Sequence, residues 1–217
     1  MMHEQENCRL CNTLSPMFHI TNDRYYFKCP NCGGIFLSQL FLPNEARELD
    51  RYEAHNNNVR DTHYRQFVSP ITEAIIAYFN KQHIGLDFGA GPGPVITTVL
   101  RENGYHVETY DPFFDNRPEV LNIAYNYIAC CEVAEHFHQP YLEFEQLKSL
   151  LKPGGKLFIM TDLYKEKINF DNWYYKDDLT HVFFYQKQTF KWIQDSLEFH
   201  DLEIKGRLIT FSKSSNS

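Results

Sequence analysis

The chain after residue 69 carries short apolar runs separated by segments with helical spacing. In the segment 126–131, every residue after Asn126 is apolar, which is typical of a parallel strand covered on both faces. Apolar residues three or four apart predict the intervening helices. We expect strands at 84–88, 105–110, 126–131 and 156–161, helices at 69–82, 95–101, 141–151 and 188–196, and a closing antiparallel hairpin at 198–204 and 207–211.

The part before residue 69 has a different pattern. A strand is predicted at 24–28, within a cysteine-rich region, and a helix at 43–52. We therefore divide the chain into residues 1–42, a helical linker at 43–68, a main domain at 69–213 and a frayed tail at 214–217. One long segment, 162–179, is rich in rings and is expected to form a binding wall, because long loops tend to be functional.

A glycine-dense turn follows the strand predicted at 84–88. Gly89 and Gly91 match the first and third positions of a dinucleotide fingerprint, but Pro94 stands at the sixth. Pro92 and Pro94 have no N–H to offer a phosphate, and the carboxylate of Asp87 would repel one. This turn therefore favours a nucleoside that has no phosphate and carries a positive charge.

These motifs resemble those of the class I S-adenosylmethionine (SAM)-dependent methyltransferases. Asp87, Gly89, Gly91 and Gly93 match the first motif, and Asp111, 24 residues after Asp87, matches the acid that holds the ribose. Segments 131–137 and 151–157 are similar to the end of the fourth strand and the turn into the fifth. The resemblance implies a Rossmann-like seven-stranded sheet, parallel with an antiparallel last strand, and SAM as cofactor. The implied cofactor contacts are Asp87, Gly89, Ala90, Gly91, Pro92, Gly93, Asp111, Pro112 and Glu132. In the resembled fold the N-terminal segment crosses the strand ends, which implies that the linker covers the cofactor; its ring and basic side chains are Arg51, Tyr52, His55, His63, Tyr64 and Arg65. The alternative is a solvated connector.

Two histidines are candidate catalytic bases. His136 follows the fourth strand, and strand ends face the ligand crevice in this fold. His181 precedes a run of aromatic residues, at a place that lies beside the acceptor in the small-molecule enzymes the chain resembles. Imidazole titrates near neutrality and can take a proton as the methyl group arrives. The alternative for each ring is a purely structural role.

Four of the six cysteines predict a metal site. Cys8 and Cys11, then Cys29 and Cys32, form two Cys-x2-Cys pairs separated by 17 residues, the spacing of a zinc ribbon. Four thiolates leave no open coordination position, so we expect a structural Zn²⁺ and no catalytic metal. The alternative is two disulfides. Cys130 and Cys131 fall in an apolar strand, where they are expected to be buried and reduced.

Composition bears on the acceptor. The net charge of −7 argues against a nucleic-acid partner, and together with the ring-rich segment 162–179 it favours a small, partly apolar or aromatic acceptor that receives the methyl on O, N or C. The resemblance to ubiquinone-type O-methyltransferases and sugar C-methyltransferases implies the same acceptor class. Two alternatives stay open: an RNA methyltransferase that binds RNA through its zinc ribbon, and an inactive SAM-binding protein. No apolar run is long enough to span a membrane, so we expect a cytoplasmic protein. The oligomeric state is not indicated.

Overall fold

The computed structural model describes residues 4–54 and 58–215. His55, one of the linker residues predicted to cover the cofactor, lies outside the described part. Its strands are β1 Gln5–Asn7, β2 Leu14–Thr21, β3 Arg24–Lys28, β4 Ile35–Leu37, β5 Ile84–Phe88, β6 His106–Tyr110, β7 Tyr125–Cys131, β8 Leu151–Met160, β9 Phe183–Phe184, β10 Asp201–Lys205 and β11 Leu208–Ser212. Its α-helices are α1 Glu45–Glu53, α2 Thr62–Tyr78, α3 Val95–Glu102, α4 Pro140–Ser149 and α5 Lys187–Ser196. Within these residues, no helix combines the length and apolar character needed to cross a bilayer.

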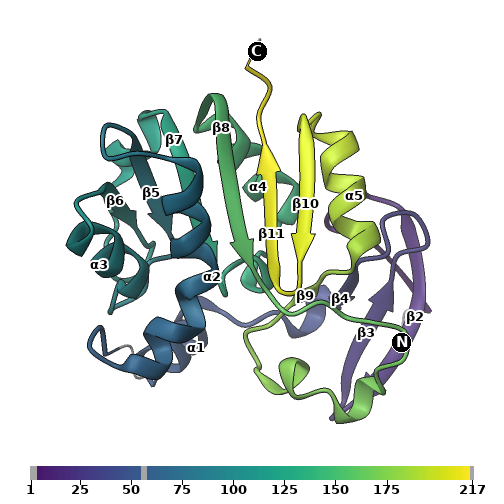
Figure 1. Ribbon diagram of the computed structural model, residues 1–217. Helices are drawn as coiled ribbons and strands as arrows, with labels where there is room; N and C mark the ends of the chain where they lie inside the picture. The colour runs from purple at the N-terminus through teal and green to yellow at the C-terminus, as the bar shows by residue number, and fades with distance from the viewer. Residues whose placement is uncertain (1–3, 55–57, 216–217) are drawn as a thin grey trace.

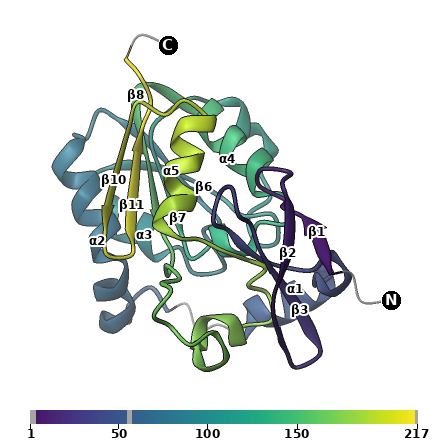
Figure 2. The same cartoon turned by 90° about the vertical axis from the view of Figure 1, so that its right-hand side faces the viewer.

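The larger sheet has the strand order β10-β11-β8-β7-β5-β6. The pairs β8–β7, β7–β5 and β5–β6 are parallel, whereas β11 runs antiparallel to both of its neighbours. Helices α2 and α3 cover one face, and α4 and α5 cover the other (Figures 1 and 2). The expected α/β sheet with an antiparallel strand is therefore confirmed. The carboxyl ends of the parallel strands lie at the lower edge of the sheet in Figure 1.

The expected count of seven strands is wrong for the described residues, where this sheet has six. The stretch between β6 and β7 forms a turn closed by a bridge between Asp111 and Asp115, and then the short 3₁₀ helix Pro118–Asn122. This stretch is too short for a crossover helix and a further parallel strand, and its two prolines cannot donate ladder hydrogen bonds.

Helix α2 begins earlier than the sequence indicated. Its N-cap is Asp61, whose carboxylate accepts hydrogen bonds from the backbone N–H of His63 and Tyr64. The expected start at Ser69 is wrong, and Pro70 lies inside the helix. An N-cap acid that satisfies two free N–H groups stabilises the additional turns and offsets the bond that proline removes. The predicted boundary between residues 68 and 69 consequently falls within a continuous helix.

The smaller sheet has the order β1-β2-β3-β4-β9 and joins distant parts of the chain. Strand β4, from the cysteine-rich region, pairs with β9, which follows His181. The guanidinium of Arg9 donates hydrogen bonds to the carbonyl oxygens of Leu37 (2.6 Å) and Val182 (2.8 Å). The cysteine-rich region thus shares a sheet with the chain segment that carries a catalytic candidate.

The ring-rich segment packs mostly against the smaller sheet. The side chains of Tyr164, Phe170 and Trp173 are buried in one apolar cluster with Tyr26 and Phe184. The ring centroids of Phe170 and Tyr26 are 5.1 Å apart, in an edge-on arrangement. The expectation that these rings form a binding wall is therefore wrong for these three, because burying large rings against the sheet stabilises the fold.

Candidate functional site

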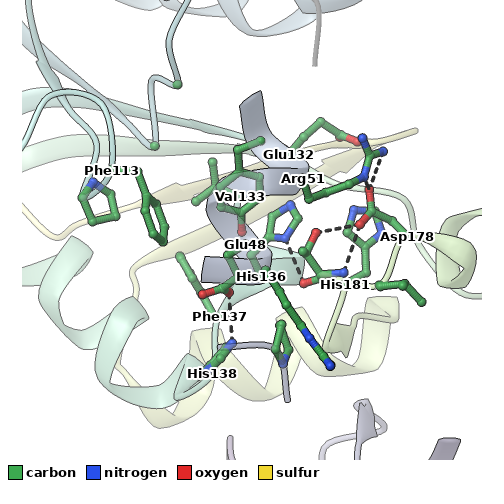
Figure 3. A pocket seen from close by; sticks show the side chains of 18 of the residues that line it. Glu48, Arg51, Phe113, Glu132, Val133, His136, Phe137, His138, Asp178 and His181 are labelled. Carbon is green, nitrogen blue, oxygen red and sulfur yellow. Dashed lines mark hydrogen bonds and ion pairs between the residues drawn. The ribbon is translucent and has the colours of Figure 1, made fainter. Parts of the chain in front are cut away.

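A cavity of about 2030 Å³ opens at the carboxyl ends of the parallel strands. Its wall is formed by α1, the turn after β5, the loops after β6 and β7, and residues 174–181. Figure 3 shows part of this wall from close by, and the labelled side chains lie around one space. Loops that follow parallel strands meet at one edge, so side chains distant in sequence converge there.

The turn after β5, residues 89–94, is here called the glycine loop. Gly89 has φ +75° and Gly91 has φ +64°, a region that residues with a Cβ rarely adopt. The N–H of Gly89 donates to the carbonyl of Tyr110 at 2.8 Å, which ties the loop to β6. A Cβ at Gly89 would lie 2.4 Å from a methyl carbon of Val133. Glycine is therefore required at 89 both by its backbone angle and by its close neighbour.

The carboxylate of Asp111 is held by backbone donors at the end of β6. Its Oδ2 accepts from the N–H of Gly91 at 2.9 Å, and its Oδ1 accepts from Phe113 (2.9 Å) and Phe114 (3.1 Å). Two carboxylate oxygens offer about four acceptor positions, so this arrangement fixes the side chain and leaves capacity for a ligand hydroxyl. Asp111 can thus accept from a sugar at the mouth of the glycine loop.

The predicted cofactor contacts differ in where they lie. Asp87 is buried with its Oδ2 accepting from the Thr97 hydroxyl (2.8 Å) and backbone N–H (3.2 Å), at the start of α3. Burial raises the pKa of Asp87 to about 6. Asp87 and Gly93 do not line the cavity, whereas the remaining predicted contacts do: Gly89, Ala90, Gly91, Pro92, Asp111, Pro112 and Glu132.

The two candidate bases, His136 and His181, lie side by side in the cavity wall and are here called the histidine pair. Their ring centroids are 4.8 Å apart. Nδ1 of His136 donates to the carbonyl of Thr180 (2.9 Å), and Nδ1 of His181 donates to that of Tyr175 (2.6 Å). A carbonyl can only accept, so each neutral ring carries its lone pair on Nε2. Burial, with a smaller effect of His181, lowers the pKa of His136 to about 3, so this ring is neutral at pH 7.

Glu135 is a component of the site that the sequence interpretation missed. Its carboxylate has no solvent exposure and accepts hydrogen bonds from the hydroxyls of Thr161 (3.0 Å) and Tyr175. Its Oε1 lies 4.0 Å from Nε2 of His181. Burial is the main cause that raises its pKa to about 8, and the nearby Glu132 adds to it. Its position directly before His136 was the available signal, but sequence does not show that a side chain points inward.

Glu132 lies beside Glu135 in an uncommon backbone conformation, with φ +53°. Its Oε2 accepts from Arg207 at 2.6 Å and lies 3.3 Å from the Tyr175 hydroxyl. Its Oε1 is buried and has no hydrogen-bond partner among the described residues. A strained residue with an unsatisfied buried oxygen is often part of a functional site.

Helix α1 closes the cavity with side chains one turn apart. Arg51 pairs with Asp178 (2.8 Å), and Glu48 pairs with His138 (3.1 Å), as the dashed lines in Figure 3 show. The ring of Tyr52 packs edge-on against His136, with centroids 5.2 Å apart. The sequence indicated Arg51 and Tyr52 but not their partners, because ion pairs between distant segments leave no local pattern.

The other basic and aromatic residues of the linker lie in different places in the structure. Tyr64 lines the cavity. His63 is exposed, and Arg65 instead forms a two-bonded ion pair with Glu102 on α3, with both nitrogen–oxygen distances at 2.8 Å.

The cysteines fall into the two expected groups. The sulfurs of Cys8, Cys11, Cys29 and Cys32, here the cysteine cluster, all lie within 4.8 Å of one another, and none of the four lines the cavity. Sγ of Cys8 is 3.6 Å from that of Cys32, and Sγ of Cys11 is 3.3 Å from that of Cys29. Four sulfurs about 2.3 Å from one tetrahedral Zn²⁺ would be about 3.8 Å apart, so the arrangement fits the ion. Cys130 and Cys131 are free thiols, and burial raises the pKa of both. Cys130 is buried as expected, whereas Cys131 is half-buried and lines the cavity.

Comparison with known proteins agrees with this geometry. The family model of the methyltransferase domain matches residues 60–204. The ubiquinone biosynthesis O-methyltransferase of Sodalis glossinidius (strain morsitans) is 33% identical over 81 residues, which cover 36% of this chain and 31% of that protein. The chain thus matches about a third of the length of this relative.

Solved structures share the fold at low sequence identity. A 1,6-didemethyltoxoflavin-N1-methyltransferase from Burkholderia thailandensis, with bound 1,6-didemethyltoxoflavin and S-adenosylhomocysteine, aligns over 91% of this chain and 99% of its own (14% identity, TM-score 0.55). A magnesium protoporphyrin IX methyltransferase from Synechocystis, with bound SAM, aligns over 79% and 92% (13% identity, TM-score 0.53). The chain therefore belongs to the methyltransferase-domain family and has the fold of SAM-dependent methyltransferases.

Proposed function

We propose that this protein transfers the methyl group of SAM to an O, N or C atom of a small acceptor. The observation that carries the proposal is the single cavity that extends from the glycine loop and Asp111 to the histidine pair. A methyl transfer needs the sulfonium and the acceptor atom in line within one water-poor space, and orientation supplies much of the rate. The family match and the fold of SAM-bound relatives support the same activity.

We assign cofactor binding to the glycine-loop end. Asp111 would accept from the ribose, and the loop backbone would approach the nucleoside closely because Gly89 and Gly91 carry no side chain. Asp87 acts indirectly, by fixing the start of α3 behind the loop. SAM supplies the activated methyl group when bound, so the residues here need only bind, orient and exclude water.

We assign acceptor binding to the other end of the cavity. The rings of Tyr52 and Tyr174 line it and offer apolar surface to a small molecule. His136 and His181 each have an Nε2 that can accept a hydrogen bond from an acceptor O–H or N–H. Such a wall suits a partly apolar acceptor with at least one polar group.

We also propose that the cysteine cluster binds one structural Zn²⁺. The four clustered sulfurs support this. The pairing of β4 with β9 connects the cysteine-rich region to the acceptor end of the cavity. Metal analysis of the purified chain should give about one zinc per chain, and Cys8→Ser with Cys32→Ser should lose it. A zinc-free chain with the native fold would contradict this assignment.

Calorimetry with SAM tests the proposed function. Asp111→Asn should weaken SAM binding at least tenfold, because the amide has one acceptor oxygen where the carboxylate has two and carries no charge (about 1.4 kcal/mol or more). Glu143→Gln is the matched control, since Glu143 also lines the cavity but lies on α4. Absence of SAM binding to the wild-type chain, or equal affinity in both variants, would contradict the proposal.

A further inference from the structure

We propose that Glu135, His136 and His181 form a second metal site, which binds a divalent cation in the cavity wall and is separate from the cysteine cluster. One ligand atom from each of the three residues lies within 4.8 Å of the others. Ligands about 2.1 Å from one ion are about 3 to 4 Å apart, so a shift of under 1 Å would bring them to bonding distance. The site lies on a turn after β7, a strand of the larger sheet, and on the segment before β9, a strand of the smaller sheet.

Both imidazoles are oriented as metal-binding histidines usually are. A ligating histidine donates its second ring N–H to a carbonyl or carboxylate, which fixes the tautomer and the ring plane. His136 and His181 donate in this way to the carbonyls of Thr180 and Tyr175. In the neutral rings the lone pairs are therefore on Nε2, and both residues line the cavity.

A cation is a suitable neighbour for the buried carboxyl group of Glu135, and on binding it would replace the proton that the raised pKa otherwise keeps there. A buried carboxylate is costly unless it is paired or protonated. Among the described residues, the ion-pair partner of Glu135 is the imidazole of His181 at 4.0 Å, and no lysine or arginine reaches it. The hydroxyls of Thr161 and Tyr175 fix both oxygens in position. This is the outer support that keeps a ligating carboxylate oriented.

Glu132 adds an independent observation. Tyr175 hydrogen-bonds to Glu135 and lies 3.3 Å from Oε2 of Glu132, so the two carboxylates are neighbours that share one hydroxyl. Arg207 compensates Glu132, yet the buried Oε1 of Glu132 has no partner among the described residues. Glu132 is not one of the three clustered ligands, so it is a polar neighbour of the site and not a fourth ligand.

The ligand set defines the class of cation and of acceptor. Two imidazoles with one carboxylate suit borderline divalent ions such as Mn²⁺, Fe²⁺, Co²⁺ and Zn²⁺, whereas four thiolates select Zn²⁺. Three protein ligands leave positions open for a bound molecule. This step rests on the proposed methyl transfer. When the ion is bound, the Nε2 lone pairs of His136 and His181 are used for the ion and no longer accept from the acceptor directly, so the acceptor is one that can place an oxygen on the ion, such as a hydroxyl-bearing ring.

Titration of the zinc-loaded full chain with Mn²⁺, followed by the electron paramagnetic resonance signal of free Mn²⁺, tests the site. We expect one Mn²⁺ per chain, and at least tenfold weaker binding in His136→Ala, His181→Ala and Glu135→Gln. His138→Ala is the matched control, because His138 lies on the same loop and in the same cavity wall but outside the cluster, and it should bind Mn²⁺ as the wild type does.

SAM calorimetry on each variant, without added metal, separates loss of the site from loss of the fold. A variant that keeps its SAM affinity but no longer binds Mn²⁺ supports the site. If His136→Ala or Glu135→Gln loses both SAM and Mn²⁺ binding, the more conservative variants His136→Gln and Glu135→Asp are tested in their place. Equal Mn²⁺ affinity in wild type and the three variants would overturn the inference. A wild-type chain that does not bind Mn²⁺ would also overturn it, provided that dialysis against Co²⁺, Fe²⁺ or Zn²⁺ leaves no ion on the chain other than the one in the cysteine cluster. If that chain binds SAM with normal affinity, the proposed function is still supported and only the metal site is refuted. If the chain binds the metal ion but not SAM, the metal site is supported and the proposed function is refuted.

Discussion

The two ends of the cavity are built in different ways. The glycine-loop end comes from one short stretch after β5 and the adjoining end of β6, and backbone hydrogen bonds hold it together. The histidine end is assembled from α1, the turn after β7 and residues 174–181, and buried side chains hold it together. Its last segment continues into β9, which pairs with β4 of the smaller sheet.

This difference indicates which perturbations reach which end. The backbone hydrogen bonds that hold the glycine-loop end join parts of the larger sheet only. The histidine end depends also on the smaller sheet, because Arg9 donates to the carbonyl of Val182 and the N–H of Val182 donates to the carbonyl of Glu135 (2.8 Å). Acceptor binding should therefore be sensitive to the cysteine cluster, and cofactor binding much less so.

Removal of the proposed zinc should have the largest effect. Chelation should lower the free energy of unfolding by about 5 kcal/mol or more, because metal binding and folding of a small metal-bound unit are coupled. Hydrogen exchange should accelerate more at Val182 and Phe184 than at Leu86 and Gly89. Adding Zn²⁺ back is the control. Uniform acceleration at both ends would show that the cluster does not act selectively on the histidine end.

Substitution in the glycine loop should have the next largest effect and act on the other end. Gly89→Ala should lower the free energy of unfolding by about 4 kcal/mol and impair SAM binding, because the new Cβ combines an unfavourable φ with the 2.4 Å approach to Val133. Gly206→Ala is the matched control: Gly206 has φ +64° but no atom within 4 Å of a new Cβ, so it should lose only about 1 kcal/mol. Urea denaturation measures both, and equal losses would exclude the contact with Val133 as the cause.

The smallest predicted effect is a pH dependence from Asp87. Burial raises the pKa of Asp87 from 3.8 to about 6, so between these values the folded protein keeps a proton that the unfolded chain releases. The stability from this proton is fully present below pH 3.8 and is lost as pH rises through 6. Relative to Asp87→Asn, the wild type should lose up to about 3 kcal/mol between pH 3.8 and 7. If the free energies of unfolding of the wild type and Asp87→Asn changed equally with pH, the prediction would be contradicted.

The sequence predicted the glycine-loop end well and the histidine end in part. The order of Asp87, Gly89 and Asp111 along the chain indicated a strand, a tight turn and a second strand, all of which are local features. His136 and His181 were identified one by one, but not as a pair. Glu135 was missed because its role follows from Thr161 and Tyr175, both distant in sequence. The rings of the 162–179 segment were misassigned because apolar periodicity does not tell a ligand wall from a sheet partner.

The sequence by itself determined the α/β class, the glycine loop, the clustering of four cysteines and two histidine candidates, because each depends on residues close together or on spacing within a motif. Only the tertiary structure decided that the larger described sheet has six strands, that β9 joins the smaller sheet, and that Glu135 lies close to both histidines. The physical reason is that burial and pairing between distant segments depend on how the whole chain packs.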